Sequence, residues 1–376
     1  MKILFAISSV FYLLGCGENQ VRQLAMSNSH NLELRLKQSE THCRLANEDL
    51  DIGAYLSKTP DKQLVSVVRD QEAPQHGLVQ IDPVSLRLTL LDESATEAAE
   101  IKLSDEFIAY RNKESVWLLA NGKPEELLNS GVSRLMAFDQ TSESTTLQIE
   151  NTSGGFDWIC FDQNHLVSGG ASSEDFVLSL AHDPHGRQWI VLESTDGIYL
   201  QRASLCTDSN LITYRPKHKF RTDHAKLVVT DKEAFISYLN RENGNFELLI
   251  FNLESELWTH ETIDGIAYQN YLGMDIDAQI VAPFERPIYL YLDAWKLEPK
   301  LAIYSLGKWT TSHIGIGGSS GFYNQILSTK NNIMKIAFRS FRNEMSTGRS
   351  SFENLVLCEI DFQPMVDTKN VPDTSR

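Results

Sequence analysis

The sequence predicts an all-β protein: a β-propeller of seven four-stranded blades, preceded by a signal peptide and an N-terminal helix. Short β-rich runs broken by Gly, Asn and Asp clusters fill the chain from about residue 62 to 364. A strand–turn–strand unit recurs along this stretch, and a second unit recurs after it in matching order. The 42% hydrophobic content is ample for a core.

The first recurring unit has the pattern of a hairpin. Each copy joins an apolar run, a polar turn around Asp, Thr or Asn, and a returning run that ends in small or aromatic residues. Such turn residues bond their own backbone and tolerate tight conformations. The copies are residues 103–110, 180–191, 229–238, 274–282 and 326–338.

The second unit supplies two further strands. Residues 248–253 continue to Trp258, and residues 301–306 continue to Trp309 in the same way. Together the two units make a module of roughly forty to fifty residues, the period of propeller blades. The roughly 300 residues available give about seven copies, with six or eight as the alternative counts and a pair of β-sandwiches as the alternative fold. The approximate blade starts are Lys62, Glu100, Val132, Asp175, Asp223, Tyr271 and Phe322.

A closed ring requires the first and last blades to meet, because an open ring exposes unpaired strand edges. A strand over 62–69 is therefore expected to complete the blade that holds 355–360, or to pack directly against it. The helix preceding the repeats is expected to lie outside the ring, so that its removal leaves the ring intact.

The N-terminus has the pattern of an export signal. Lys2 precedes the apolar run 3–14, and Leu13-Leu14-Gly15-Cys16 resembles the bacterial lipobox. The resemblance implies cleavage before Cys16 and attachment of the acyl chains to that residue. Gly17 follows Cys16 where the inner-membrane sorting signal would have Asp, which implies the outer membrane of a two-membrane bacterium.

Four segments follow from these boundaries: a signal peptide (1–15), a lipid anchor with a helical stalk (16–57), the β-propeller (58–364) and a flexible tail (365–376). The stalk helix is predicted from a stripe at alternating steps of four and three. A coiled-coil seam is the alternative interpretation of this stripe. Its members are Ala25, Ser29, Leu32, Leu36, Ser39, Cys43, Ala46 and Leu50.

The charge excludes two classes of partner. The formal net charge is −16, and removal of Lys2 with the signal peptide makes it −17. Nucleic-acid binders need a basic footprint to displace counterions from phosphates. Broad adhesion to an anionic lipid surface is equally unfavourable, since the protein carries charge of the same sign. Membrane attachment is therefore assigned to the lipid at Cys16.

Four cysteines remain after Cys16 is assigned to the anchor: Cys43, Cys160, Cys206 and Cys358. In an exported chain they permit two disulfides, with three pairings open. Free cysteines buried on strands are the alternative.

The hairpin pattern resembles that of the sialidase-like propellers and related bacterial repeat lipoproteins, most clearly over residues 175–338. The chain departs from a full Asp-box, Ser-x-Asp-x-Gly-x-Thr-Trp, and Ser194-Thr195-Asp196-Gly197 matches it only in part. Residues 183–189 also resemble the tryptophan-docking repeats of quinoprotein-like propellers.

The sialidase-like resemblance implies a glycoside hydrolase as an alternative function, with an arginine cluster for a substrate carboxylate. No spacing singles out such a cluster. His182 and His185 flank a predicted turn, and neither a metal site nor a cofactor is predicted. The candidate arginines are Arg187, Arg202, Arg215, Arg221, Arg339, Arg342 and Arg349.

One basic run stands out in this acidic chain. Arg215, Lys217, Lys219 and Arg221 flank Phe220 and form a candidate anion-binding segment, with a solvated inter-blade loop as the alternative. The leading hypothesis is a lipid-anchored scaffold that binds an envelope protein or a glycan, with the hydrolase acting at the central channel as the alternative. The fold itself does not decide between them.

Overall fold

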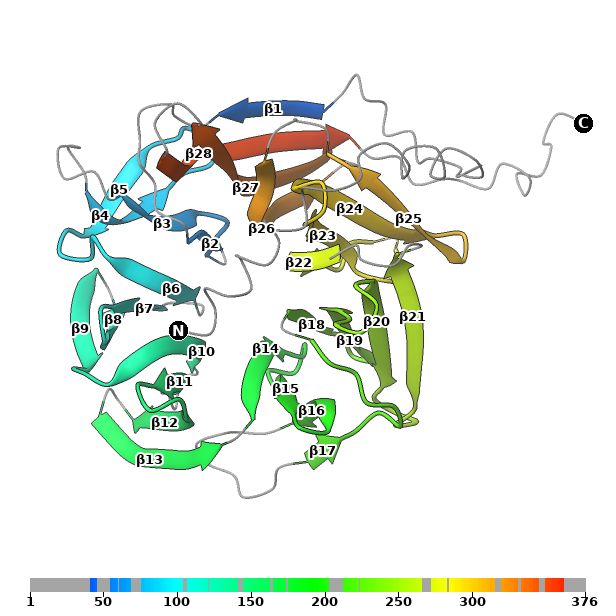
Figure 1. Ribbon diagram of the computed structural model, residues 1–376, viewed down its shortest axis with the longest axis horizontal. Helices are drawn as coiled ribbons and strands as arrows, with labels where there is room; N and C mark the ends of the chain where they lie inside the picture. The colour runs from blue at the N-terminus through cyan, green and yellow to red at the C-terminus, as the bar shows by residue number, and fades with distance from the viewer. Residues whose placement is uncertain are drawn as a thin grey trace, which may run out of the picture. The chain divides into compact units, whose positions relative to one another are not determined.

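The computed structural model contains seven four-stranded antiparallel sheets arranged in a ring (Figure 1), and the region around the ring axis is called the channel. Every element in the part of the chain that it describes is a β-strand. The fold is a seven-bladed β-propeller, as predicted. The structure describes residues 41–361 except 46–54, 60, 69–75, 104–106, 121, 141–144, 163–164, 174, 203–211, 223, 266–271, 283, 315–318, 331–332 and 345–348.

Each of the first six blades consists of four consecutive strands, with the first strand next to the channel. Blade 1 contains β2 (Ser57–Lys58), β3 (Leu64–Val68), β4 (Gly77–Ile81) and β5 (Leu88–Asp92). Blade 2 contains β6 (Ala98–Leu103), β7 (Phe107–Asn112), β8 (Ser115–Ala120) and β9 (Lys123–Leu128). Blade 3 contains β10 (Val132–Gln140), β11 (Thr145–Asn151), β12 (Phe156–Asp162) and β13 (His165–Ser173).

The second half of the ring follows the same plan. Blade 4 contains β14 (Phe176–His182), β15 (Gln188–Ser194), β16 (Gly197–Arg202) and β17 (Ile212–Tyr214). Blade 5 contains β18 (Ala225–Val229), β19 (Glu233–Leu239), β20 (Phe246–Asn252) and β21 (Trp258–Asp264). Blade 6 contains β22 (Leu272–Gln279), β23 (Ile288–Asp293), β24 (Glu298–Ser305) and β25 (Lys308–His313). Blade 7 contains β26 (Ser319–Lys330), β27 (Ile333–Glu344), β28 (Arg349–Asp361) and, as its outermost strand, β1 (Thr41–Leu45).

The predicted blade starts are confirmed to within five residues of the first residue of each inner strand. Four of the five predicted hairpins form, at β6–β7, β14–β15, β18–β19 and β26–β27. The hairpin predicted at 274–282 is wrong, because β22 continues through Asp275 and Asp277 to Gln279. These two aspartates lie on a channel-lining strand and do not form a turn.

The ring is closed by β1, a strand in a segment predicted to be helical. β1 pairs antiparallel with β28, so that N-terminal and C-terminal segments share blade 7. The predicted helix is therefore wrong at Thr41–Leu45, and removing this segment would expose the edge of β28. The strand expected over 62–69 is β3, which pairs within blade 1. Its Leu64 and Val68 do pack against Leu355 and Leu357 of blade 7, the second form of the prediction.

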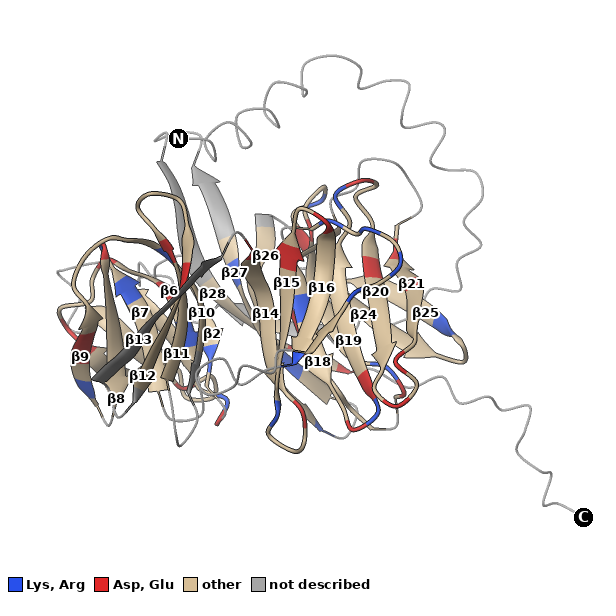
Figure 2. Cartoon of the chain, turned by 90° about the horizontal axis from the view of Figure 1, so that it is seen from below, with Lys and Arg blue, Asp and Glu red and all other residues tan. Residues whose placement is uncertain are grey.

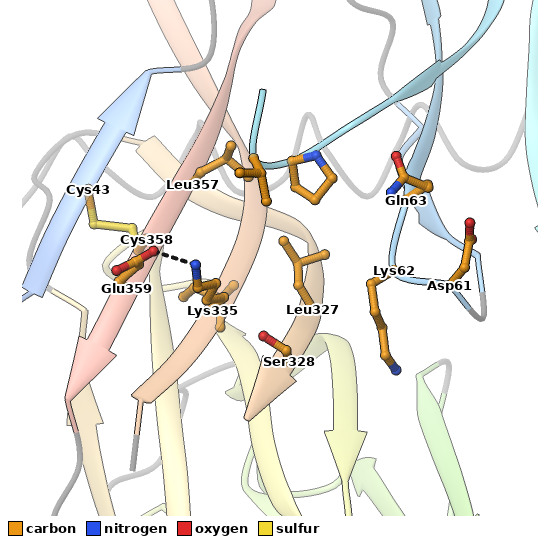
Figure 3. A pocket seen from close by; sticks show the side chains of 13 residues that line it. Cys43, Asp61, Lys62, Gln63, Leu327, Ser328, Lys335, Leu357, Cys358 and Glu359 are labelled. Carbon is orange, nitrogen blue, oxygen red and sulfur yellow. Dashed lines mark ion pairs between the residues drawn. A yellow bond between two sulfur atoms is a disulfide. The ribbon is translucent and has the colours of Figure 1, made fainter. Parts of the chain in front are cut away.

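A disulfide between Cys43 and Cys358 fastens the closing strand to β28, across a sequence separation of 315 residues. The two cysteines are direct partners in the strand register. They border a cavity of about 610 Å³ that extends to the first hairpin of blade 1 and to Leu327 of β26 (Figure 3). Cys160 is also disulfide-bonded. Cys43 therefore pairs with Cys358, one of the three partners left open. The alternative of free cysteines is wrong for Cys43, Cys160 and Cys358.

Apolar side chains between neighbouring blades hold the ring together. Middle strands such as β3 and β23 are buried along their whole length. Outer strands are more exposed, as in β9, where Lys123–Glu126 face solvent. Buried clusters join blades 1 and 2, 2 and 3, 3 and 4, 4 and 5, 5 and 6, and 7 and 1. Each blade buries its faces against its neighbours, which is why the inner ends of the strands are held in fixed positions.

A buried carboxylate in blade 5 is fully satisfied by hydrogen bonds. The side chain of Glu247 is 3% exposed. Burial opposes its ionisation, but the hydrogen bonds outweigh burial and lower the pKa of Glu247 from 4.5 to about 2. Its partners, at 2.8 to 3.0 Å, are the side chains of Tyr238, Asn240, Asn243 and His260.

The predicted signal peptide, the Cys16 anchor, residues 17–40 and 46–54 of the stalk segment, and the tail at 365–376 lie outside the described residues. Within the described ranges, no helix has the length and apolar character needed to cross a bilayer. Lys, Arg, Asp and Glu positions of the propeller lie along both of its rims (Figure 2).

Candidate functional site: a lysine-lined pocket in the channel

The inner strands of five blades surround a pocket of about 560 Å³ in the central channel. Its basic side chains are Lys58 on β2, Lys62 in the following turn, Lys102 on β6 and Lys226 on β18, with His182 at the end of β14. No Asp or Glu is among the described residues that line it. Four lysines thus gather in one pocket of a chain whose net charge is −16.

Two of these lysines share one carboxylate. The carboxylate of Asp277 on β22 forms ion pairs with Lys58 Nζ at 2.9 Å and with Lys226 Nζ at 3.1 Å. Its Oδ2 also accepts a hydrogen bond from the Ile326 amide at 2.7 Å. Burial opposes ionisation of Asp277, but the charges of Lys226 and Lys58 and the amide bond outweigh it, so that its pKa is lowered. The carboxylate neutralises one of the two ammonium groups and leaves an excess positive charge.

Lys102 lacks such compensation. Among the described residues, no carboxylate lies within 4 Å of its ammonium group. Burial lowers the pKa of Lys102, the charges of Arg134 and Lys226 lower it further, and Glu100 opposes them. Glu100 is itself bound at 2.8 Å by Arg111, and it accepts the Leu135 amide at 2.6 Å. Lys102 is thus a partly buried cation whose environment disfavours its charge.

Bulges in the inner strands set the direction of the channel side chains. Register shifts interrupt β6, β10, β14, β22 and β26 where each pairs with the second strand of its blade. Glu100, Asp275 and Tyr323 have positive φ angles of 53°, 46° and 54° at these shifts. Such left-handed backbone is costly for residues with a side chain, and bulges commonly re-aim side chains at functional sites.

Hydrogen bonds between inner strands fix the channel wall. In each of three cases a side-chain oxygen on one blade accepts a backbone amide of the next blade. The pairs are Glu100 with Leu135, Ser179 with Leu227 and Asp277 with Ile326, at 2.6 to 2.9 Å. Ser179 also lines the lysine-lined pocket. Because its oxygen accepts an amide, its hydroxyl proton is still available for donation.

The basic run predicted as an anion site lies outside this pocket. It joins β17 to β18 and crosses the β15–β16 turn, in the inter-blade position that the sequence analysis gave as the alternative. Lys219 Nζ lies 2.5 Å from Asp196, and Arg221 donates to the Thr195 carbonyl at 3.0 Å. The Arg215 guanidinium lies 4.1 Å from the Tyr199 ring centre. Lys217 is exposed. Three of the four cations therefore have partners in the fold, and anion binding by this run stays a prediction.

Phe220 of the same run explains why the β15–β16 turn, which it contacts, has a glycine at position 197. The Ile198 amide donates to the Phe220 carbonyl at 2.9 Å. Gly197 has φ +100°, and a Cβ there would lie 2.7 Å from that carbonyl oxygen. The loop can close over the turn only because Gly197 has no side chain.

The candidate arginines of the hydrolase alternative are dispersed. Arg187 binds Asp183 at 2.6 Å within the β14–β15 turn, and Arg202 stacks 5.8 Å from the Trp189 ring. Arg339 is fully buried in β27. The side chains of Arg342 and Arg349 lie outside the described residues. The arginines that are described do not line the pocket, so they give the hydrolase alternative no support.

The predicted turn at His182 and His185 is confirmed, and it is organised by Asp183. Asp183 accepts the amides of His185 and Arg187 and the Trp189 indole N–H, at 2.9 to 3.1 Å. His185 lies 3.4 Å from Asp231 of the adjacent blade. No group of three His, Cys, Asp or Glu side chains suited to a metal ion occurs among the residues described.

No protein-family model and no curated protein matches the sequence. Solved structures do match. The WD40 repeats of RRP9 superpose with a TM-score of 0.52 at 10% identity, over 86% of this chain and 98% of that one. YCF48 from Cyanidioschyzon merolae gives 0.50 at 8% identity, over 84% and 98%. A structure from a study of two prolyl endopeptidases gives 0.51 at 11% identity, over 85% of this chain and 51% of that one.

These similarities establish the architecture alone. The protein has the β-propeller fold of the WD40 repeats of RRP9, and a similar fold occurs in a chain from the study of two prolyl endopeptidases. Function therefore has to be argued from the pocket and its charges.

Proposed function

We propose that the protein is a lipid-anchored scaffold of the cell envelope, whose propeller binds an anionic protein or glycan through the lysine-lined pocket. The observation that carries this proposal is the set of four lysines, without a lining Asp or Glu among the described residues, in the channel of an acidic chain. Complementary charge steers a partner to its site and excludes partners of the wrong sign.

The construction of the channel supports a binding role. Five blades contribute side chains to one pocket, and hydrogen bonds between blades hold its wall in place. A preorganised site loses little conformational entropy when its partner binds. Rigid placement of the lysines is therefore what a recognition site requires.

The lipobox-like sequence that ends at Cys16 supports the anchor, and the Cys43–Cys358 disulfide is typical of exported proteins. Cys16→Ser tests this part. We expect the full chain to incorporate labelled palmitate and to fractionate with outer membranes, and the variant to lose both properties. A variant that stays in the membrane fraction, with an unlabelled wild type, would contradict the anchor.

Site-specific photo-cross-linking in cells tests the binding site. A photo-reactive amino acid replaces Met136, which lines the pocket, or Leu257, which is 65% exposed in the β20–β21 turn of blade 5. We expect a discrete cross-linked product from position 136 that disappears on Lys102→Gln and persists with Lys308→Gln, a change on the outer strand β25. Equal products from both positions, or a product indifferent to Lys102, would refute the proposal.

A further inference from the structure

The lysine-lined pocket shows which chemical class of ligand it fits. Lys102 and Lys226 repel each other across the pocket, and Lys226 and Lys58 have one carboxylate between them. A bound anion would relieve both imbalances at once. Because Asp277 cancels only one charge, an anion that carries more than one negative charge fits this set better than a monoanion.

The presence of lysine and not arginine narrows the chemical class of the ligand. An arginine presents a planar fork that matches a carboxylate, whereas a lysine acts as a compact point charge and is a common phosphate ligand. The described residues that line the pocket include four lysines and no arginine. The Ser179 hydroxyl adds a donor on the same wall, and such hydroxyls serve as neutral partners for phosphate oxygens.

The remaining wall of the pocket is mixed, with Thr59 and His182 beside apolar residues. The volume of about 560 Å³ exceeds what a lone phosphate needs and is typical of small-molecule sites. The pocket therefore has room for a carbon skeleton attached to the phosphate. The apolar residues in its lining are Leu103, Met136, Ala137, Phe138, Val177, Leu178, Leu180, Ala181 and Ala225.

We infer that the channel pocket binds a phosphate monoester, with Lys102, Lys226 and Lys58 around the phosphate and the organic part in the remaining volume of the pocket. The inference rests on the proposed function and specifies the anionic group that the partner carries. A phosphorylated sugar, free or at the end of a glycan, has the required charge and size.

Isothermal titration of the lipidated full chain in detergent, at low salt, tests the inference. The probes are glucose 6-phosphate, inorganic phosphate, glucose and acetate. We expect saturable binding of glucose 6-phosphate, weaker binding of inorganic phosphate, and no binding of glucose or acetate up to millimolar concentrations. Lys102→Gln is expected to weaken glucose 6-phosphate binding by about tenfold or more. Lys308→Gln serves as the charge-matched control and should bind like the wild type.

The outcomes separate the two proposals. Absence of glucose 6-phosphate binding, equal binding by Lys102→Gln, or acetate binding of similar strength would overturn the phosphate assignment. If cross-linking at position 136 still depends on Lys102 in that case, the scaffold proposal stands and the ligand carries another anion. Lys102→Arg provides a folded variant that keeps the charge, and it should retain part of the affinity that Lys102→Gln loses.

Discussion

The disulfide between Cys43 and Cys358 should supply a large share of the stability of the ring. It closes a loop of 315 residues, and the chain-entropy relation for a loop of this length gives a limit of about 6 kcal/mol. Measured effects commonly fall below that limit. We expect the double variant Cys43→Ala/Cys358→Ala to lose about 2–5 kcal/mol of unfolding free energy.

Equilibrium unfolding in urea measures this loss directly. The matched control is Lys335→Ala, which breaks the exposed 2.7 Å ion pair with Glu359 on the same sheet and should cost less than about 1 kcal/mol. The double variant should also aggregate more readily near its transition, because release of β1 exposes the edge of β28. A double variant as stable as the control would refute the conclusion that this link holds the ring closed.

Three further changes test other parts of the structure. The folded pKa of Glu247, about 2, lies below its ordinary 4.5, so its ionised form should stabilise the fold by about 3 kcal/mol above pH 4.5. This contribution is lost as the pH falls toward 2. The difference in unfolding free energy between the wild type and Glu247→Gln, measured in urea, should therefore shrink on acidification. A difference that stays constant with pH would contradict the assigned pKa. Lys102→Met should raise the unfolding free energy by about 0.5–2 kcal/mol, since it removes a partly buried charge without a carboxylate partner, and a loss of stability would contradict that view of Lys102. Gly197→Ala should cost about 1–3 kcal/mol of unfolding free energy and so lower the melting temperature, because the alanine Cβ would clash with the Phe220 carbonyl. An unchanged melting temperature would show that the loop at 215–221 does not lie on the β15–β16 turn.

Local signals sufficed to predict the blades. The turns depend on side chains that bond their own backbone, as Asn252 does when it accepts the amides of Glu254 and Ser255. These signals lie within a few residues of one another, so the blade start at Val132 is correct and that at Asp175 is one residue early.

The closing strand could not be identified in the same way. Thr41–Leu45 contains one β-branched residue and lies on a helical stripe, and its partner strand is about 315 residues away. Its conformation is decided by the unpaired edge of β28, a tertiary effect that overrides local preference.

The pocket was missed for a related reason. Lys58, Lys102 and Lys226 are far apart in the sequence, and only the closed ring brings them together. A signal was present in the alternation of Met274-Asp275-Ile276-Asp277-Ala278, which is typical of a strand with one polar face. Interpreting its aspartates as turn formers hid the carboxylate that Lys58 and Lys226 share.

The central claim is that the channel pocket binds an anion in preference to the basic run at 215–221. Anomalous diffraction from crystals soaked in tungstate, an oxyanion of phosphate-like shape, tests this most directly. We predict the strongest tungsten peak inside the channel, within hydrogen-bond distance of the Lys102 and Lys226 ammonium groups. A channel without a peak in crystals that bind tungstate at Lys217 and its neighbours would contradict the claim.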